Sequence, residues 1–309
     1  MRSKRVWILL AIAVVVIVAL FIWKPWREAA PTPSPQAGPV ASQTPSPANR
    51  YEPERAQAEA GAQQALDAEA VAVLAKTDEA QSRIAAKDKA GAIRALEEAA
   101  GKADILVGRD PAAALIPAAT EVQIIDVAPA DLGQVRKLRR AVELAVLTDD
   151  FPKARVALDG MRSEIRVRTY YLPLATYPAA LASAAGLVER GDLTGAAEAL
   201  DRARSTLAMT DVAIPLPLLA AETAVEAAKA DTDAQKKLGH VGAARAALER
   251  TEALGYASRD VRKALLAEIR EVERQAKGGS DIKAGLEQLK ERISKAIGDL
   301  KAERKSAEA

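Results

Sequence analysis

Apolar positions recur three and four residues apart through most of the 309-residue chain, the spacing that places them on one face of a helix. One submotif, a turn residue followed by Ala at +4 and +7 and Leu at +8, begins at Asp88, Asp150, Asp192 and His240. The copies are irregularly spaced, so the pattern predicts antiparallel helical hairpins rather than a regular solenoid. We expect helices over residues 54–107 (with a candidate break near 87–88), 129–147, 152–162, 178–190, 194–209, 217–230, 234–254 and 259–276.

Two runs depart from the helical period. Residues 121–127 are rich in branched side chains and lack Ala, and in residues 164–171 branched or hydroxylated side chains alternate with Arg. An isolated strand would leave its backbone groups unpaired, so the two runs predict a two-stranded antiparallel pair. The expected fold class is all-α, built from antiparallel helical hairpins with this small β element.

The C-terminal segment has a different pattern. Apolar side chains alternate steps of four and three from 281 to 308, which is a short heptad seam, at Ile282, Leu286, Leu289, Ile293, Ala296 and Leu300. A Gly-Gly-Ser joint at 278–280 separates the seam from the preceding helices. The seam fits two arrangements equally well, pairing with its copy in another chain or folding back on the body.

Residues 6–23 contain no polar side chain, and three basic residues precede them. This run can cross a bilayer, and the positive-inside rule then places the N-terminus in the cytoplasm. A cleaved signal peptide is the alternative, but the run ends in bulky and charged residues rather than a small-residue cleavage site. We predict an uncleaved signal anchor over 1–28, a Pro-rich semi-rigid linker over 29–50, a helical domain over 51–276 and an amphipathic helix over 277–309.

Charge and composition narrow the function classes. Residues 1–50 hold six Lys or Arg and one acid, whereas residues 51–309 are mildly acidic with mixed signs, which argues against nucleic-acid binding. The chain has no Cys and one His, which excludes thiolate chemistry and a His-rich metal site. No nucleotide-binding, metalloprotease or serine-hydrolase motif occurs, so we predict a protein that is not an enzyme and carries no cofactor or metal.

The strongest candidate for a binding surface is the stretch 164–178, which holds three of the five tyrosines and two prolines. Tyr combines a large contact area with a polar tip, as binding surfaces require. The alternative is that these rings fill the core where the β element meets helices. The candidate binding residues here are Tyr170, Tyr171, Leu172, Pro173 and Tyr177.

Three other features have plain structural readings. Arg109 and Asp110, just before Pro111, are a second candidate binding corner, although the sequence favours a helix end with a local ion pair. The basic cluster at 136–140 spans more than one helix face, which favours solvated surface over a phosphate site. His240 stands alone and is expected to be structural.

Several local motifs together carry a family resemblance. They include Gly-Lys-Ala-Asp-Ile-Leu-Val-Gly-Arg-Asp-Pro at 101–111, Leu-Pro-Leu-Ala-Thr-Tyr-Pro-Ala at 172–179, Ile-Pro-Leu-Pro-Leu-Leu-Ala at 214–220 and Leu-Gly-Tyr at 254–256. In this order, over roughly residues 58–275, the chain resembles the YfdX family of bacterial exported proteins. The resemblance implies a helical periplasmic stress protein, with chaperone-like behaviour described for some members and no catalytic residue to carry over.

These observations predict a membrane-anchored, periplasmic, stress-associated binding or chaperone-like module in the bacterial inner membrane. The alternative is a scaffold or adaptor in a cell-envelope complex that assembles through its helical hairpins and its C-terminal heptad helix. The expected partners are the inner membrane through residues 6–23, protein clients or envelope proteins, and a further copy of the chain.

Overall fold

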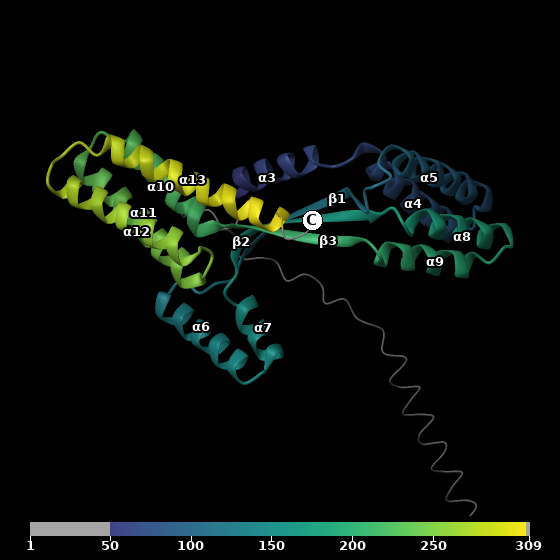
Figure 1. Ribbon diagram of the computed structural model, residues 1–309, viewed down its shortest axis with the longest axis horizontal. Coiled ribbons are helices and arrows are strands. Elements are labelled where there is room, and N and C mark those ends of the chain that lie inside the picture. Colours follow the sequence, from purple (N-terminus) through teal and green to yellow (C-terminus); the bar gives the residue numbers. More distant parts are fainter. Residues whose placement is uncertain (1–49, 307–309) are drawn as a thin grey trace, which may run out of the picture. The chain divides into compact units, whose positions relative to one another are not determined.

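The computed structural model describes residues 50–306, which belong to one compact unit (Figure 1). The predicted anchor, its membrane helix at 6–23 and the Pro-rich linker up to residue 49 lie outside the described residues. Within residues 50–306, no helix combines the length and apolarity that crossing a bilayer requires.

Helices dominate the described part of the chain, as the apolar period predicts. They are α3 (Glu52–Gln64), α4 (Ala68–Ala85), α5 (Lys89–Arg109), α6 (Leu132–Leu147), α7 (Phe151–Asp159), α8 (Tyr177–Glu189), α9 (Leu193–Ser205), α10 (Leu216–Ala230), α11 (Ala234–Leu254), α12 (Arg259–Lys277) and α13 (Lys283–Ser306).

Aspartate side chains set many of the helix starts. Asp88, Asp150 and Asp192 each accept a hydrogen bond from the backbone N–H three residues later and so cap α5, α7 and α9. The turn residue of the recurrent submotif is therefore an N-cap. His240 is an exception, because it lies inside α11 with its Nε2 3.5 Å from Asp231, so the expectation that it begins a helical turn is wrong.

Two predicted helix boundaries also need correction. The region 54–107 is three helices, because Asp67 caps a new helix by accepting the N–H groups of Glu69 and Ala70, in addition to the break at Asp88. The helix expected from 129 begins at Leu132, because Asp131 accepts the N–H of Gln134 and fixes the start there. Side-chain capping, rather than the position of Pro129, decides this boundary.

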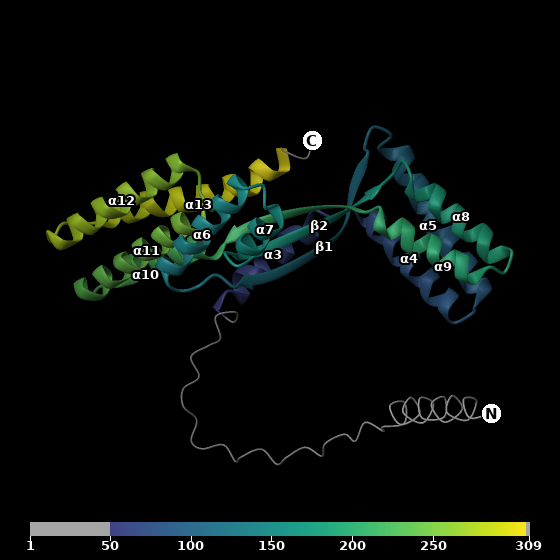
Figure 2. The same cartoon turned by 90° about the horizontal axis from the view of Figure 1, so that it is seen from below.

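A three-stranded antiparallel sheet replaces the expected two-stranded pair. The strands β1 (Leu115–Asp126), β2 (Ser163–Pro173) and β3 (Ala208–Pro215) lie in that order, side by side in Figure 2. Val122 lies opposite Val167, and Val167 lies opposite Val212. The predicted pairing of the first two runs is confirmed. The helix expected to reach residue 209 ends at Ser205, because the chain there turns to form β3.

The helices and strands enclose two main apolar cores. The first is formed by α4, α5, α8 and α9 and is lined largely by alanines, which allow close helix packing. Ile116 and Leu172 extend the sheet into this core. The second is formed by α10, α11, α12 and α13, and Ile165 and Ile214 extend the same sheet into it.

The C-terminal helix α13 belongs to the second core. All six residues of its heptad seam pack there, and five of them are at most 6 % exposed. A Cβ added at Gly285 would come within 3.0 Å of the Val272 side chain, so α12 and α13 approach closely. Of the two arrangements that fit the seam, the structure has the one in which it folds back on its own chain.

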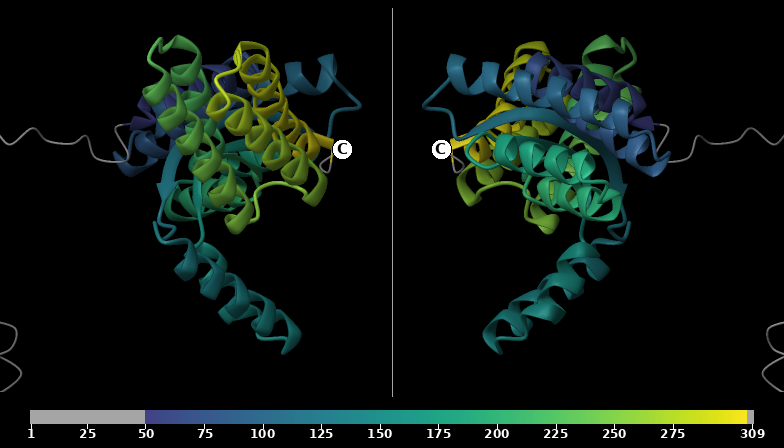
Figure 3. Two further views of the ribbon diagram at one scale, coloured as in Figure 1. Left: turned by 90° about the vertical axis from the view of Figure 1, so that its left-hand side faces the viewer. Right: turned by 90° about the vertical axis from the view of Figure 1, so that its right-hand side faces the viewer.

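The pair α6–α7, which we call the hairpin, stands apart from both cores. Figures 1 and 3 show its two helices side by side, joined to the rest at one end. A small third cluster lies at that end, where Val135 and Met161 pack with Ala253 and Leu254 at the end of α11. The Arg250 guanidinium adds hydrogen bonds to the carbonyl oxygens of residues 128–130.

Candidate functional site

The sheet has two chemically different faces. Successive strand residues point to opposite sides, so β2 directs Ile165 and Val167 to one face and Arg166 and Arg168 to the other. The register places Ile124, Val122, Val212 and Ile214 beside the first pair. One face is therefore apolar and the other charged, and we describe them in turn.

A groove of about 860 Å³ lies on the apolar face, between the sheet, α3 and α13. Its apolar and small lining residues are Ile165, Val167, Val212 and Ile214 from the sheet, Ala58, Gly61, Ala62 and Ala65 on and after α3, and Leu219 and Ile297 from α10 and α13.

Helix α3 covers the groove loosely. It contacts β1 and β2, yet none of its residues is buried. The residues that it presents to the groove are small, so they leave space above the sheet rather than filling it. Pro53 at its N-terminal turn and two acidic residues there explain why a helix begins at this point.

Two carboxylates give the groove a polar side. Glu54 Oε2 is shielded from solvent and has no hydrogen-bond partner among residues 50–306. Glu222 lines the same groove from α10 and accepts a hydrogen bond from Ser294 Oγ on α13. A shielded carboxylate oxygen without a donor is costly, so Glu54 is suited to meet a donor or a cation from outside.

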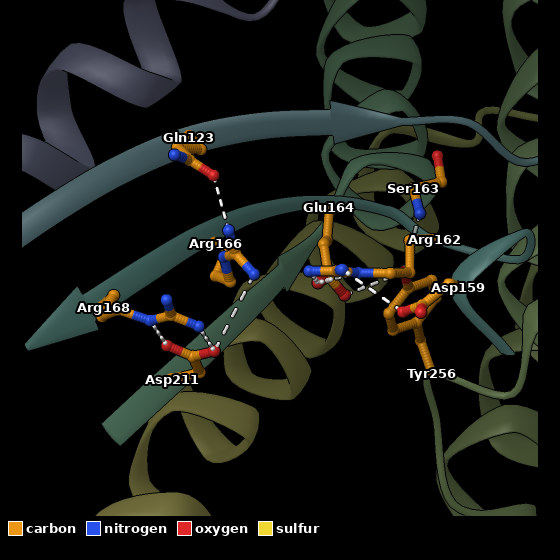
Figure 4. A network of polar contacts seen from close by, with 9 residues as sticks. All are labelled: Gln123, Asp159, Arg162, Ser163, Glu164, Arg166, Arg168, Asp211 and Tyr256. Carbon is orange, nitrogen blue, oxygen red and sulfur yellow. Dashed lines mark hydrogen bonds and ion pairs between the residues drawn. The ribbon is translucent and has the colours of Figure 1, made fainter. Parts of the chain in front are cut away.

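The polar side chains on the charged face of the sheet form hydrogen bonds and ion pairs with one another. Arg168 donates two hydrogen bonds of 2.7 Å to the carboxylate of Asp211, and Arg166 donates one of 2.5 Å to Gln123 (Figure 4). The bond from Arg168 lowers the pKa of Asp211 despite partial desolvation. These cross-strand pairs hold β1, β2 and β3 in register rather than forming a reactive centre.

At the start of β2, a buried carboxylate joins the sheet to the C-terminal helices. Glu164 is 8 % exposed and accepts hydrogen bonds from Arg162 at 3.3 Å and from the Tyr256 hydroxyl at 3.0 Å. The same hydroxyl accepts the backbone N–H of Ser163 at 2.8 Å (Figure 4). Burial raises the pKa of Tyr256. The phenol thus remains a neutral donor and acceptor that fixes this corner.

The predicted tyrosine surface is distributed over separate places. Tyr170 and Tyr171 are consecutive on β2 and point to opposite faces, where their hydroxyls meet Glu121 at 3.3 Å and Thr210 at 3.4 Å. Leu172 and Tyr177 are fully buried in the first core, and Pro173 ends β2. The Tyr177 hydroxyl lies 3.5 Å from Thr77 Oγ1, and burial raises the pKa of Tyr177.

The predicted corner at Arg109 and Asp110 connects helix ends. Arg109 pairs with Asp110 at 2.7 Å and with Asp67, the N-cap of α4, at 2.5 Å. The pairs fasten the end of α5 to the start of α4. Asp110 also lines a small hollow with Leu174 and Ala175, and neither residue lines the groove.

Sequence reasoning missed the residues of the groove. Val212 and Ile214 alternate with Asp211 and Ala213, which is a short strand signal, but they fall between the helices expected over 194–209 and 217–230. Glu54 carried no signal of its own, because an acid in the first turn of a helix is common. Among the described residues, no three acidic or His side chains converge as a metal-ligand set.

The fold and groove define a helical protein organised around a small antiparallel sheet, with an apolar hollow on one face. Residues 73–213 match the family model described as YfdX protein, so the expected resemblance to the YfdX family is confirmed over that part of the chain. The match runs from within α4 to within β3 and is narrower than the 58–275 expected. Among solved structures, Salmonella Typhi YfdX is similar, with 12 % identity, a TM-score of 0.32 and coverage of 49 % of this chain and 93 % of that one. None of the curated proteins matches.

Proposed function

We propose that this protein is a membrane-anchored periplasmic module that binds cationic amphiphiles in the groove under α3, as a stress-associated and chaperone-like activity. The observation that carries the proposal is an apolar sheet face beside a carboxylate oxygen of Glu54 that has no hydrogen-bond partner among residues 50–306. The proposed activity is binding without catalysis.

The dimensions and chemistry of the groove support such a ligand. Its volume of about 860 Å³ falls in the range of about 300–1,000 Å³ that small-molecule sites occupy. The branched side chains of β2 and β3 would take an alkyl or aromatic portion, and Glu54 and Glu222 would take the positive group. The loose cover given by α3 allows ligands of different lengths to enter.

The proposed location rests on the sequence. Residues 6–23 would span the inner membrane with the N-terminus in the cytoplasm, and the Pro-rich linker would hold the helical body in the periplasm away from the bilayer. A binding module placed there meets amphiphiles that enter the cell envelope. Exposed apolar segments of unfolded proteins are the related clients for a chaperone-like role.

Calorimetric titration of residues 45–309 with dodecyltrimethylammonium, below its micellar concentration, tests the proposal. We expect saturable binding that Ala62→Trp abolishes by filling the groove. The double variant Glu54→Gln with Glu222→Gln should bind about ten- to hundredfold more weakly, since a charged hydrogen bond contributes about 1.5–3 kcal/mol. Glu52→Gln, which changes an acid on α3 outside the groove lining, is the matched control.

Two results would contradict this proposal. Equal binding of dodecyl sulfate would show that the carboxylates do not contribute to binding. Unchanged binding by Ala62→Trp would show that the ligand does not occupy the groove. The chaperone-like part is tested separately by suppression of aggregation of an unrelated client, which Ala62→Trp should also impair. Thermal melts of each variant establish that it folds.

A scaffold function is the second candidate, favoured by the apolar side chains that the hairpin exposes. The C-terminal helix is not available for that role, because its seam is covered by its own chain. Assembly would then use the hairpin, and the choice of its partner is considered next.

A further inference from the structure

The hairpin exposes a concentration of large apolar side chains. Six of the twelve such exposed residues in the described part of the chain belong to it. They form what we call the hairpin patch, and their exposed fractions are Leu144 62 %, Val146 49 %, Leu147 81 %, Phe151 54 %, Val156 74 % and Leu158 51 %. Scattered apolar residues are ordinary on a surface, but this number within two short helices marks an interaction site.

Two helices cannot cover these side chains by themselves. The residues of α6 and α7 that are buried are Val135, Ala145 and Ala154, and the third cluster lies at the joined end. The joined end is held by Arg250, while the patch runs from the tip, at Leu147 and Phe151, along α7 to Leu158. Both helices have Asp N-caps, so the hairpin presents a defined surface rather than a loose loop.

The charges of the hairpin differ between its two ends. Four basic side chains, Arg136, Lys137, Arg139 and Arg140, lie in the first half of α6, whereas Asp149 and Asp150 form the tip. At 1.5 Å per residue, the tip lies roughly 17 Å along the helix from the basic stretch. An antiparallel partner with the same sequence would place each acidic tip beside the other copy's basic stretch.

We propose that the hairpin patch docks against the hairpin patch of a second copy of this chain, forming an antiparallel four-helix bundle with two-fold symmetry. A two-fold interface uses the same surface twice, so one patch covers the other. Four helices around a shared apolar centre are a stable arrangement, whereas two are not. The acidic tip, which would enter first, opposes insertion into a bilayer, where a charge is expensive.

In the antiparallel arrangement, one residue lies close to the same residue of the second copy. The midpoint between the basic stretch and the tip falls near Leu144, so the two copies of this residue lie close to the symmetry axis. The chain has no Cys, which allows a single Leu144→Cys to report on that contact. The matched control is Ile105→Cys on α5, whose residue is similarly exposed at 56 %.

The test is oxidative cross-linking of the full chain in native membranes. Leu144→Cys should yield a disulfide-linked dimer at least fivefold more efficiently than Ile105→Cys. Two charge-reversed versions of Leu144→Cys extend the test, one with Asp149→Lys and Asp150→Lys and the other with Arg136→Glu and Lys137→Glu. Each alone should lose at least fivefold in dimer yield, and co-expression of the two should restore a mixed dimer.

Co-expression should restore the dimer because the basic tip of one variant then faces the acidic stretch of the other, and their opposite charges attract. Cross-linking yields no higher for Leu144→Cys than for Ile105→Cys would overturn the proposal, as would cross-links to a different protein alone. If the charge-reversed pair fails to restore the dimer, the antiparallel arrangement is wrong. Vesicle binding that Leu144→Glu removes, without any self-cross-link in Leu144→Cys, would assign the patch to lipid instead.

Discussion

Helix α13 and the hairpin are both amphipathic, but their apolar side chains have opposite surroundings. Leu286 and Leu289 of α13 are at most 1 % exposed, whereas Leu144 and Leu147 of α6 are more than 60 % exposed. Helix α13 packs against α10, α12 and β3, and the hairpin meets the rest of the chain at one end only in the described structure. The same helical period therefore serves an intramolecular core in one place and an open surface in the other.

The polar contacts of the two regions follow the same division. Lys290 on α13 forms an ion pair with Glu226 on α10. Lys229 on α10 forms another with Glu287 on α13, at 2.5 Å. The hairpin has local pairs instead, such as Arg139 with Glu143 one turn away. Ion pairs that link different helices fix the placement of α13, whereas pairs within one helix leave the hairpin free to meet a partner.

The largest expected effect is a difference in stability between substitutions in α13 and in the hairpin. Leu289→Ala removes a fully buried side chain from the second core and should lower the free energy of unfolding by about 2–5 kcal/mol. Leu147→Ala is the matched control, since its side chain is 81 % exposed, and should change stability by about 0.5 kcal/mol or less. Urea unfolding of residues 45–309 measures both. Equal losses would mean that the hairpin is as well covered as α13.

The contrast also explains which parts of the fold the sequence could predict. Helices and their Asp caps depend on local patterns, so most of them are recognisable, and the pairing of β1 with β2 follows from two strongly β-like runs. Strand β3 was missed because its residues carry a weaker strand signal than the branched runs of β1 and β2. The submotif at His240 matches the pattern but lacks a capping Asp, and there the helix simply continues.

The candidate site was less accessible to prediction. The tyrosines attracted attention because they are rare in this chain, yet Tyr177 is a core residue and Tyr170 and Tyr171 point apart. The groove depends on three strands lying together and on how closely α3 approaches them, which no local pattern encodes. The heptad seam of α13 was visible, but whether its partner was internal depended on the apolar faces of α10 and α12.

The second prediction concerns the joined end of the hairpin. Tyr256→Phe keeps the ring but removes the hydroxyl that donates to buried Glu164 and accepts the N–H of Ser163. The backbone N–H of Ser163 then lacks this acceptor and buried Glu164 keeps only Arg162 as a donor, so we expect the free energy of unfolding in urea to fall by about 1–3 kcal/mol. Tyr170→Phe is the control, because Tyr170 is only partly buried and its hydroxyl lies 3.3 Å from Glu121 on the charged face of the sheet. A similar loss in both would mean that the buried corner has no special role.

The third prediction, with a smaller expected effect on stability, concerns the carboxyl group of Glu268, which pairs with Arg292 of α13. Burial raises the pKa of Glu268, partly offset by Arg292, whose Nε lies 3.4 Å away. A carboxyl whose folded pKa is raised binds more protons in the folded state, so its charged form destabilises the fold as pH rises. Glu268→Gln should therefore increase stability at pH 7 by about 0.5–1 kcal/mol, with the gain shrinking near pH 4.

Thermal unfolding at the two pH values measures this change. Glu291→Gln, on the exposed side of α13, should leave stability unchanged at both. A loss of stability in Glu268→Gln at pH 7 would show instead that its pair with Arg292 stabilises the placement of α13.

The smallest effect is an acid weakening of the contact between α10 and α13. The hydrogen bond from Lys290 lowers the pKa of Glu226 from 4.5, and Lys229 adds to it against some desolvation. Stability from a depressed carboxyl is complete above its unfolded pKa and is lost as pH falls below it. We therefore expect no change between pH 7 and 5 from this group, and a loss of about 0.5 kcal/mol or less between pH 5 and 3, because Glu226 is 42 % exposed and solvent screens the pair.

Hydrogen exchange in α13 at pH 5 and pH 3, corrected for the intrinsic pH dependence of exchange, measures this loss where it occurs. Glu226→Gln should already show faster exchange in α13 at pH 5 and a smaller further change at pH 3 than the wild type. Glu143→Gln, which removes an exposed pair on α6, should follow the wild-type curve in α13. If Glu226→Gln retained the full acid response, other carboxylates would control the docking of α13, and its ion pairs with α10 would not distinguish it from the hairpin.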